Sequence, residues 1–404
     1  MICDVPPQPL DEGESSLLTP QFAVVMLASF AYFIAIGALI PTVPRFVEGE
    51  LGGDGLAVGI GVGSMAVTAA ALRPWVGRMG DTHGRRVLAV GGALVVAVSI
   101  LGYAVATSLW MLVVARLVTG AGEAAMFVGV ATAAQDLAPD HRRGEAASYF
   151  SVALYGGLAV GPPIGEALVG HGYVTLWVAL AASSGLAALA SMWIPRGHTV
   201  AAAPRRGFLQ RDAVWPGFIL FLGLIPFTAF SSFVPLYAED LGQSSVGAVF
   251  GLYAGLVLIV RIVGARLPDR LGWRRGSSIA LCGVTVGVWL VAGWGSMASI
   301  WLGAVALAVG MSLMYPSLFT AVMAAAPESE RTHAVGTFSV FFDLSTGLGA
   351  TIVGLVVSLS GERGGFAVAG ALAAAGLAAQ WVLRDRIGRR HLQPVAATGS
   401  EQAA

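Results

Sequence analysis

The chain has 404 residues, of which 56% are hydrophobic and only 11% are charged. Soluble globular proteins carry about 25% charged residues, so this composition excludes an ordinary soluble enzyme. The 23 basic and 23 acidic residues give zero net charge, which argues against a nucleic-acid partner. None of the basic residues is lysine, so a lysine Schiff base and a phosphate-binding loop of the glycine-lysine type are both excluded.

Apolar runs long enough to cross a bilayer follow one another along almost the whole chain. A transmembrane helix needs about 20 apolar residues, and the expected spans are 21–46, 55–79, 86–106, 109–137, 145–169, 173–194, 214–238, 245–267, 276–296, 299–326, 332–359 and 365–384. The pattern predicts an all-α polytopic membrane protein with twelve transmembrane helices. Its expected parts are a disordered tail over 1–20, a six-helix bundle over 21–194, a cytoplasmic linker over 195–213, a second six-helix bundle over 214–385 and a cytoplasmic tail over 386–404.

Arginine is distributed unevenly between the two sides of the expected spans. The linker, the C-terminal tail and the loops on their side hold most of the arginines, whereas the loops on the other side hold only Arg45 and Arg363. Because basic residues favour the cytoplasmic side of a membrane protein, we expect both termini in the cytoplasm. The expected location is the plasma (inner) membrane, crossed many times.

The second half of the chain repeats the first at a constant shift. The shift that aligns Arg73 with Arg261 also aligns Gly59 with Gly247, Asp81 with Asp269, Gly84 with Gly272 and Phe150 with Phe338. Six helices duplicated in parallel form a transporter architecture, with the substrate site between the halves. Charges present in one copy only are better candidates for substrate or proton handling than for scaffold, and these are Arg116, Glu123, Glu166 and Asp343.

A glycine- and arginine-rich motif follows the second expected span and is interpreted as a loop. It reads Gly77-Arg78-Met79-Gly80-Asp81-Thr82-His83-Gly84-Arg85-Arg86, with a degenerate copy at Pro268-Asp269-Arg270-Leu271-Gly272-Trp273-Arg274-Arg275. The pair resembles the signature loops of the major facilitator superfamily, and the resemblance covers residues 20–385. Glycines allow a tight turn, and the arginines can pair with a carboxylate at the inner end of the fourth span. The expected conformational latch consists of Gly77, Asp81, Gly84, Arg85, Arg86 and Asp136.

Two further motifs resemble those of the twelve-span drug–proton antiporters of that superfamily. The fourth span contains Leu112-x-x-x-Arg116-x-x-x-Gly120-x-Gly122, and the fifth contains Gly157-x-x-x-Gly161-Pro162-Pro163-x-Gly165. Small residues four apart let another helix pack closely, and the prolines kink the helix. The resemblance implies export, with an antiporter motif at Gly157, Gly161, Pro162 and Gly165. Two positions depart from the family pattern, because Glu166 replaces a small residue and Thr119 replaces a frequent glutamine.

Ionisable residues inside the expected spans are candidates for function, because a charge at the bilayer centre costs at least about 2.5 kcal/mol. We expect proton coupling at Glu123 and Asp343. Arg116 lies on the same face of its helix as Glu123, where we expect it to keep a carboxylate or a water chain poised. A permanent ion pair remains the alternative for Glu123, and helix packing remains the alternative for Asp343.

Other titratable residues have structural interpretations. Arg73 and Arg261 are expected to snorkel to the cytoplasmic interface, and Glu166 is expected to be exposed at the outer end of its helix. The histidines fall in loops, in tails or at helix ends, and no metal-ligand spacing appears, so no metal site is expected.

Aromatic residues on the helices expected around a central cavity are Tyr32, Phe127, Tyr155, Phe227, Phe230, Tyr315 and Phe342. An aromatic pocket with one or two carboxylates suits bulky amphiphilic compounds, cationic ones especially. We therefore expect a monomeric secondary transporter, not an enzyme, that exports small amphiphilic drugs or secondary metabolites in exchange for protons and needs no cofactor. The nearest alternative is an exporter or importer of sugars or small metabolites with the same fold. A non-transporting signalling or lipid-handling membrane protein is the alternative from another class.

Overall fold

A computed structural model describes residues 17, 19–139, 142–195, 210–243, 245–264, 267–326 and 331–387 of the chain. The expected N-terminal tail lies almost wholly outside these residues, as do 196–209 of the expected linker and 388–404 of the expected C-terminal tail. The backbone at Asp81 is described, but its side chain is not.

The described residues are almost entirely α-helical and contain no strand. The helices are α1 (Pro20–Arg45), α2 (Gly55–His83), α3 (Arg85–Tyr103), α4 (Leu109–Asp136), α5 (Arg143–Val169), α6 (Tyr173–Ser191), α7 (Arg211–Asp240), α8 (Gly247–Val263), α9 (Leu267–Gly293), α10 (Met297–Ala325) and α11 (Arg331–Ile387), and a π-helical turn, η1 (Phe46–Glu50), continues α1. The last helix has two legs, because the backbone turns back at Gly361. With both legs counted, the described part of the chain contains twelve helical rods, which confirms the predicted all-α fold.

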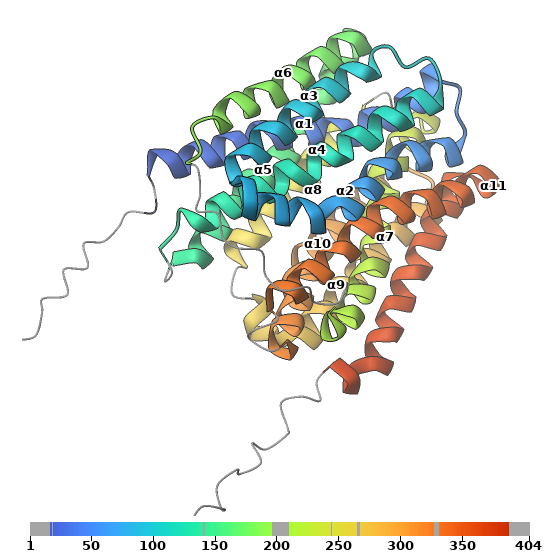
Figure 1. Ribbon diagram of the computed structural model, residues 1–404. Coiled ribbons are helices and arrows are strands. Elements are labelled where there is room, and N and C mark those ends of the chain that lie inside the picture. Colours follow the sequence, from blue (N-terminus) through green and yellow to red (C-terminus); the bar gives the residue numbers. More distant parts are fainter. Residues whose placement is uncertain are drawn as a thin grey trace, which may run out of the picture.

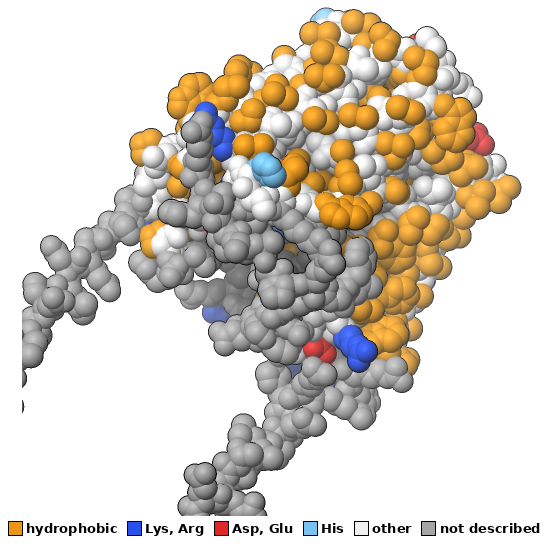
Figure 2. Space-filling model, in the orientation of Figure 1, with side chains coloured by type: hydrophobic (Ala, Val, Ile, Leu, Met, Phe, Trp, Pro, Cys, Tyr) orange, Lys and Arg blue, Asp and Glu red, His pale blue; other side chains and the backbone are white. Residues whose placement is uncertain are grey.

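The helices have the length and the surface of membrane spans. Ten stretches of the described residues are long and apolar enough to cross a bilayer, and one of them, Thr337–Leu383, contains both legs of α11. Large apolar side chains face outward, with Val98 68% exposed and Val263 83% exposed. Hydrophobic side chains are spread over the upper and right parts of the face in Figure 2, and few charged ones lie among them. The chain is therefore a multi-pass membrane protein.

Capping side chains and glycines fix where several helices begin and turn. The side chains of Thr19, Asp54 and Gln210 each accept a hydrogen bond from a backbone N–H in the first turn of α1, α2 and α7. Gly84 separates α2 from α3 with a φ of +89°, and Gly272, its counterpart in the repeat, kinks α9 with a φ of +68°. Glycine adopts such angles without strain, which accounts for its presence in both copies of the motif.

The glycine- and arginine-rich motif is helical over most of its length, which differs from the predicted loop. Helix α2 continues to His83 and α3 begins at Arg85, so Gly84 alone makes the turn. The N–H of Gly84 still donates to the carbonyl of Gly80 at 3.0 Å, which closes the last turn of α2. A single left-handed glycine thus replaces the loop, and Gly361 does the same between the two legs of α11, where φ is +74°.

The two halves of the chain, α1–α6 and α7–α11, pack against each other through repeat-related helices. In Figure 1 the blue-to-green helices α1 and α3–α6 gather in the upper part, and α7 and α9–α11 gather in the lower part. Helix α2 of the first half packs on α11, and α8 of the second half packs on α5. The shift that aligns Arg73 with Arg261 superposes α2 on α8 and α5 on the first leg of α11. These two contacts are therefore copies of one arrangement.

Glycines make the contact between α2 and α11 close. A Cβ atom on Gly59 would collide with the carbonyl oxygen of Ala350, and one on Gly63 would collide with that of Gly347. Small residues at such a crossing allow the two backbones to touch. The crossing closes the molecule at the end where α2 begins, which we call the distal end. The other end, where α1 begins and α11 ends, is the terminal end.

Candidate functional site

Three ionisable side chains meet where the two halves touch. Arg73 on α2 places its Nε 2.9 Å from Asp343 Oδ2 on α11 and its Nη2 3.4 Å from Glu123 Oε1 on α4. The side chains of Arg73, Glu123 and Asp343 are 14%, 11% and 6% exposed. The guanidinium also lies 4.7 Å from the centre of the Phe127 ring. Snorkelling of Arg73 to the interface was therefore the wrong expectation, since two buried carboxylates hold the side chain inside the bundle.

This cluster contains two carboxyl groups and one guanidinium, so full ionisation leaves it with one excess negative charge. Arg73 Nε and Asp343 Oδ2 are close but misaligned, and neither atom has a hydrogen-bond partner among the described residues. Glu123 Oε2 has none there either. A buried charge without a partner is costly, and binding one proton removes it. The arrangement is chemically able to hold one exchangeable proton on either carboxyl group.

Arg116, the third residue expected in proton coupling, has a different environment. Its Nε donates to the carbonyl of Gly61 at 3.0 Å and its Nη2 donates to that of Val62 at 2.9 Å. Both acceptors belong to α2, and Arg116 is only 4% exposed. The guanidinium thus fastens α4 to α2, while Arg73 is the arginine that contacts Glu123. The spacing of residues along α4 cannot indicate that Arg73, rather than Arg116, contacts Glu123, because Arg73 reaches Glu123 from another helix.

A cavity of about 90 Å³ lies between the halves, beside the ion-pair cluster. Residues of α1, α5, α7, α8, α10 and the first leg of α11 line it, so both halves contribute walls. Sites for drug-sized ligands have volumes of about 300–1,000 Å³. In this conformation the cavity is therefore contracted, and a bulky ligand requires the halves to move apart.

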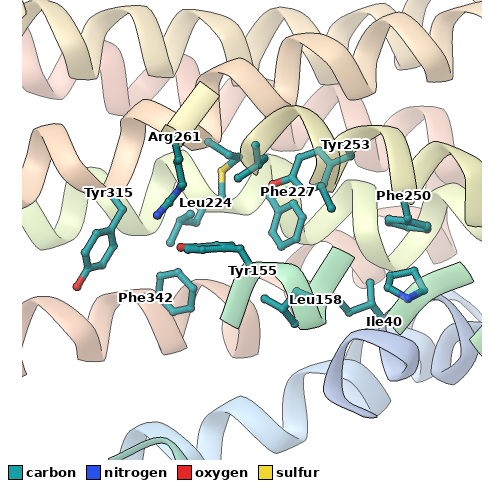
Figure 3. A pocket seen from close by; sticks show the side chains of 14 residues that line it. Ile40, Tyr155, Leu158, Leu224, Phe227, Phe250, Tyr253, Arg261, Tyr315 and Phe342 are labelled. Carbon is teal, nitrogen blue, oxygen red and sulfur yellow. The ribbon is translucent and has the colours of Figure 1, made fainter. Parts of the chain in front are cut away.

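Of the aromatic residues expected around the cavity, four line it and three do not. Tyr155, Phe227, Tyr315 and Phe342 are lining residues, as Figure 3 shows. The other three are packed elsewhere: Phe230 against Phe250, Tyr32 against Phe33, and Phe127 beside Arg73. A residue on a helix beside the cavity does not necessarily line it, because the face of the helix on which the side chain lies decides what it contacts.

Arg261 on α8 is the lining residue that the sequence interpretation placed elsewhere. Its guanidinium lies 3.9 Å from the centre of the Tyr155 ring. Figure 3 shows Arg261 reaching toward Tyr155, with Tyr315 on one side and Phe227 and Tyr253 on the other. Snorkelling was the wrong expectation here as well, because the side chain enters the cavity. The repeat gave no signal for it, because only charges present in one copy were taken as functional candidates, and Arg261 shares its position with Arg73.

The antiporter motif of the fifth span forms a seam between α5 and α1. Cβ atoms on Gly157 and Gly161 would approach the backbone of α1, at 2.8 Å from the carbonyl oxygen of Phe30 and 2.6 Å from the nitrogen of Ala38. Gly165 faces Ala38 in the same way. One face of α5 is therefore bare backbone laid against α1. Pro162, on the adjacent face, lines the cavity.

Arg45 forms ion pairs at the distal end, one of which joins the two halves. Arg45, at the end of α1, pairs with Glu166 at the end of α5 and places its Nε 2.6 Å from Glu239 Oε1 at the end of α7. The Glu166 side chain is 5% exposed, so its expected exposure at the helix end was wrong. Arg45 supplies the counter-ion that allows the carboxylate to be buried. Glu166, which stands where the family pattern has a small residue, thus takes part in the ion pairs that close the distal end.

The expected latch residues lie at the terminal end. Arg85 Nε lies 3.2 Å from Asp136 Oδ2, which ties the start of α3 to the end of α4. Gly84 makes the turn described above, and no atom would meet a Cβ on Gly77 within 4 Å. Arg86 is half-buried in the first turn of α3, and the side chain of Asp81 lies outside the described part. The described pair of Arg85 with Asp136 lies within the first half.

Comparison with known proteins places the chain among transporters of one family. The sequence model of the Major Facilitator Superfamily matches residues 25–294 and 217–401. An uncharacterized MFS-type transporter of Salmonella typhimurium is 30% identical over 367 residues, covering 88% of this chain and 94% of the relative. Another uncharacterized MFS-type transporter, from Burkholderia mallei, is 28% identical over 389 residues, covering 92% and 94%.

A solved structure has the same fold. The bacterial homolog to the human lysosomal transporter Spinster, in an inward-facing and occupied conformation, superposes with a TM-score of 0.77 at 14% identity and covers 90% of this chain and 96% of its own. At this identity the likeness concerns the fold alone. The matched residues of the family model and the similarity along the Salmonella relative identify the family directly. The chain belongs to the major facilitator superfamily and is a transporter, not an enzyme.

Proposed function

We propose that the chain exports small amphiphilic compounds in exchange for protons. The observation that carries the proposal is the cluster of Arg73, Glu123 and Asp343, in which two carboxyl groups from different halves share one guanidinium. Buried carboxyl groups at such a junction are sites where a proton can change how the halves attract each other. The cavity beside the cluster, with walls from both halves, supplies a place for the compound.

Protonation at this cluster weakens the contact between the halves. When Asp343 binds a proton it loses its charge, and the attraction between Arg73 on α2 and the first leg of α11 is reduced. The glycine crossing of the same two helices is then free to change its angle, because it depends on close packing alone. Opening widens the contracted cavity, and the proton leaves when the opposite conformation exposes the carboxyl group. The compound and the proton thus bind in turn at the contact between the two halves.

The driving force is sufficient for uphill export. Each pH unit across the membrane supplies about 1.4 kcal/mol per proton, and about 100 mV of potential adds roughly 2.3 kcal/mol. One proton per cycle therefore sustains a gradient of a neutral compound of about tenfold or more. We propose that the terminal end faces the cytoplasm of a cell bounded by a plasma (inner) membrane, with six-helix bundles over 21–194 and 214–385 as the moving bodies.

Proteoliposomes test the coupling. Antiport drives an amphiphilic aromatic compound into vesicles whose lumen is acidic, and a proton ionophore abolishes this accumulation. We expect Glu123→Gln and Asp343→Asn each to abolish the pH-driven accumulation, because each removes a proton-binding group, while both variants still insert into membranes. Asp240→Asn changes an exposed carboxylate at the end of α7 and is the matched control. Accumulation at the wild-type rate in both cluster variants excludes the cluster from coupling, and accumulation on the alkaline side indicates symport instead.

Cysteine labelling tests the orientation. In a chain whose Cys3 and Cys282 are replaced by serine, a membrane-impermeant maleimide added to whole cells should modify Glu50→Cys at the distal end. It should modify His83→Cys at the terminal end only after the membrane is permeabilised. Both positions are exposed, so accessibility reports the side of the membrane. Labelling of His83→Cys in intact cells contradicts the proposed orientation.

A further inference from the structure

The two arginines that the repeat superposes meet different partners. Arg73 has two carboxylates and a phenyl ring around it. The repeat supplies the corresponding positions around Arg261, with Tyr155 in place of Asp343, Met311 in place of Glu123 and Tyr315 in place of Phe127. All three of these replacements line the cavity together with Arg261. The two sites are thus copies of one framework, and the copy in the cavity has no carboxylate at either of the two positions.

Arg261 consequently has no counter-ion among the described residues. The ring of Tyr155 offers the face of a π-system at 3.9 Å, but no full negative charge. The Nε atom is buried and has no hydrogen-bond partner in the described part of the chain. Arginine stays protonated at any physiological pH. Of the described residues that line the cavity, Arg261 is the one that carries a charge.

The remaining walls of the cavity are aromatic and apolar. Phe227 and Tyr253 stack with ring centres 5.2 Å apart and planes 20° apart. On the other side of Arg261, Tyr315 lies with its ring centre 6.3 Å from that of Phe342. In Figure 3, Tyr315 lies on one side of Arg261, and Phe227 and Tyr253 lie on the other. Such walls suit a flat aromatic body, and the guanidinium suits an anionic group at its edge.

We propose that the cavity binds an aromatic amphiphile with a carboxylate or sulfonate group, and that this anion pairs with Arg261 as the protein's own carboxylates pair with Arg73. The expected preference for cations depended on free carboxylates at the cavity, whereas Arg73 contacts both of them. The inference names the substrate class of the proposed transporter and rests on that function. Binding, however, is measurable without any transport.

Three matched probes test the charge preference with purified protein in detergent. Naphthalenesulfonate, naphthalenesulfonamide and naphthyltrimethylammonium share the ring and differ in charge. We expect the sulfonate to bind at least about tenfold more tightly than the neutral sulfonamide, and the cation to bind most weakly. Arg261→Gln should lower the affinity for the sulfonate to about that for the sulfonamide, so that the preference disappears, and Arg261→Lys should keep part of it. Equal affinities in the wild type, or a preference that survives Arg261→Gln, overturns the proposal.

A second pair of variants leaves Arg261 in place. Met311→Glu restores the carboxylate that the other copy of the framework has, so the guanidinium becomes internally paired. We expect Met311→Glu to lose the preference for the sulfonate, and Met311→Gln, of the same length but uncharged, to retain it. Undiminished preference in Met311→Glu overturns the proposal even if Arg261→Gln does not fold.

The two proposals fail in different assays. A wild-type protein that binds the sulfonate selectively but accumulates no compound in acid-loaded vesicles refutes proton-coupled export and leaves the anion site standing. A protein that accumulates neutral and cationic probes but shows no preference for the sulfonate refutes the anion site and leaves export standing.

Discussion

Arg73 and Arg261 occupy equivalent positions in the repeat, yet substituting them leaves different side chains without a partner. Without Arg73, two buried carboxylates lose their shared counter-ion. Without Arg261, the described part of the chain loses an interaction with an aromatic ring and no ion pair. Removing one partner of a buried ion pair costs more than the pair contributes, because the remaining charge stays desolvated. Identical substitutions at the two positions therefore make an internal comparison.

We expect Arg73→Gln to lower the free energy of unfolding by about 3 kcal/mol or more, and Arg261→Gln to lower it by much less. Adding Asp343→Asn to Arg73→Gln should restore part of the loss, because it removes one of the two uncompensated charges. Thermal unfolding in one detergent is measured for the wild type, for the single variants Arg73→Gln, Arg261→Gln and Asp343→Asn, and for the double variant. Losses that simply add in the double variant would show that Arg73 and Asp343 do not interact.

At the scale of helices, the seam between α5 and α1 depends on the absence of side chains. Gly157 and Gly161 present backbone to the backbone of α1, and distances below 3 Å leave no room for even one methyl group. Glycine in a helix is otherwise unfavourable by about 1 kcal/mol relative to alanine. Close packing of the two helices offsets this cost, so the motif has a structural reason independent of the direction of transport.

Gly161→Ala should therefore destabilise the protein by about 1–3 kcal/mol through overpacking. Gly185→Ala is the matched control, because Gly185 lies inside α6 and a Cβ there meets no atom within 4 Å. The control should be neutral or stabilised by up to about 1 kcal/mol. Thermal midpoints of the two variants in the same detergent decide the matter, and a Gly161→Ala chain as stable as Gly185→Ala contradicts the seam.

Sequence patterns predict elements better than they predict partners in this chain. The apolar runs indicate all twelve rods, because each span must satisfy its backbone internally and be apolar over its length. Their ends agree within a few residues, except that α9 begins at Leu267 rather than at 276. The sequence does not indicate the partners of Arg73 in the same way. Asp343 belongs to the other half of the chain, and only the folded contact between α2 and α11 brings it near Arg73. Arg116, by contrast, shares a helix face with Glu123 but bonds to carbonyls of α2, which helical spacing cannot indicate.

At the scale of the whole molecule, the conformation is closed at the distal end. Arg45 connects α1 to α5 and, across the halves, to α7, and the glycine crossing of α2 with α11 lies at the same end. The described ion pair at the terminal end, Arg85 with Asp136, stays within the first half. The ion pair of Arg45 with Glu239, which joins the halves at the distal end, must part when that end opens.

Arg45→Gln should favour opening of the distal end. Spin labels on cysteines at Gly49 and Gln243, one in each half and both exposed, report the separation by double electron–electron resonance. We expect the distance distribution to shift to longer values in Arg45→Gln. Arg363→Gln is the control, because Arg363 lies at the same end and donates to the carbonyls of Ala292 and Gly293 of its own half. An unchanged distribution in Arg45→Gln would exclude the ion pairs from the closure.

The reversal of α11 at Gly361 also has a practical consequence for work on this protein. Since one left-handed residue joins the two legs, epitope tags or reporter fusions introduced there would have to unwind both of them. Even an alanine would have to adopt a backbone angle that side chains disfavour. Topology mapping by insertion should therefore avoid this hairpin and use the segment between α3 and α4, where residues 104–108 form a genuine connection outside the helices.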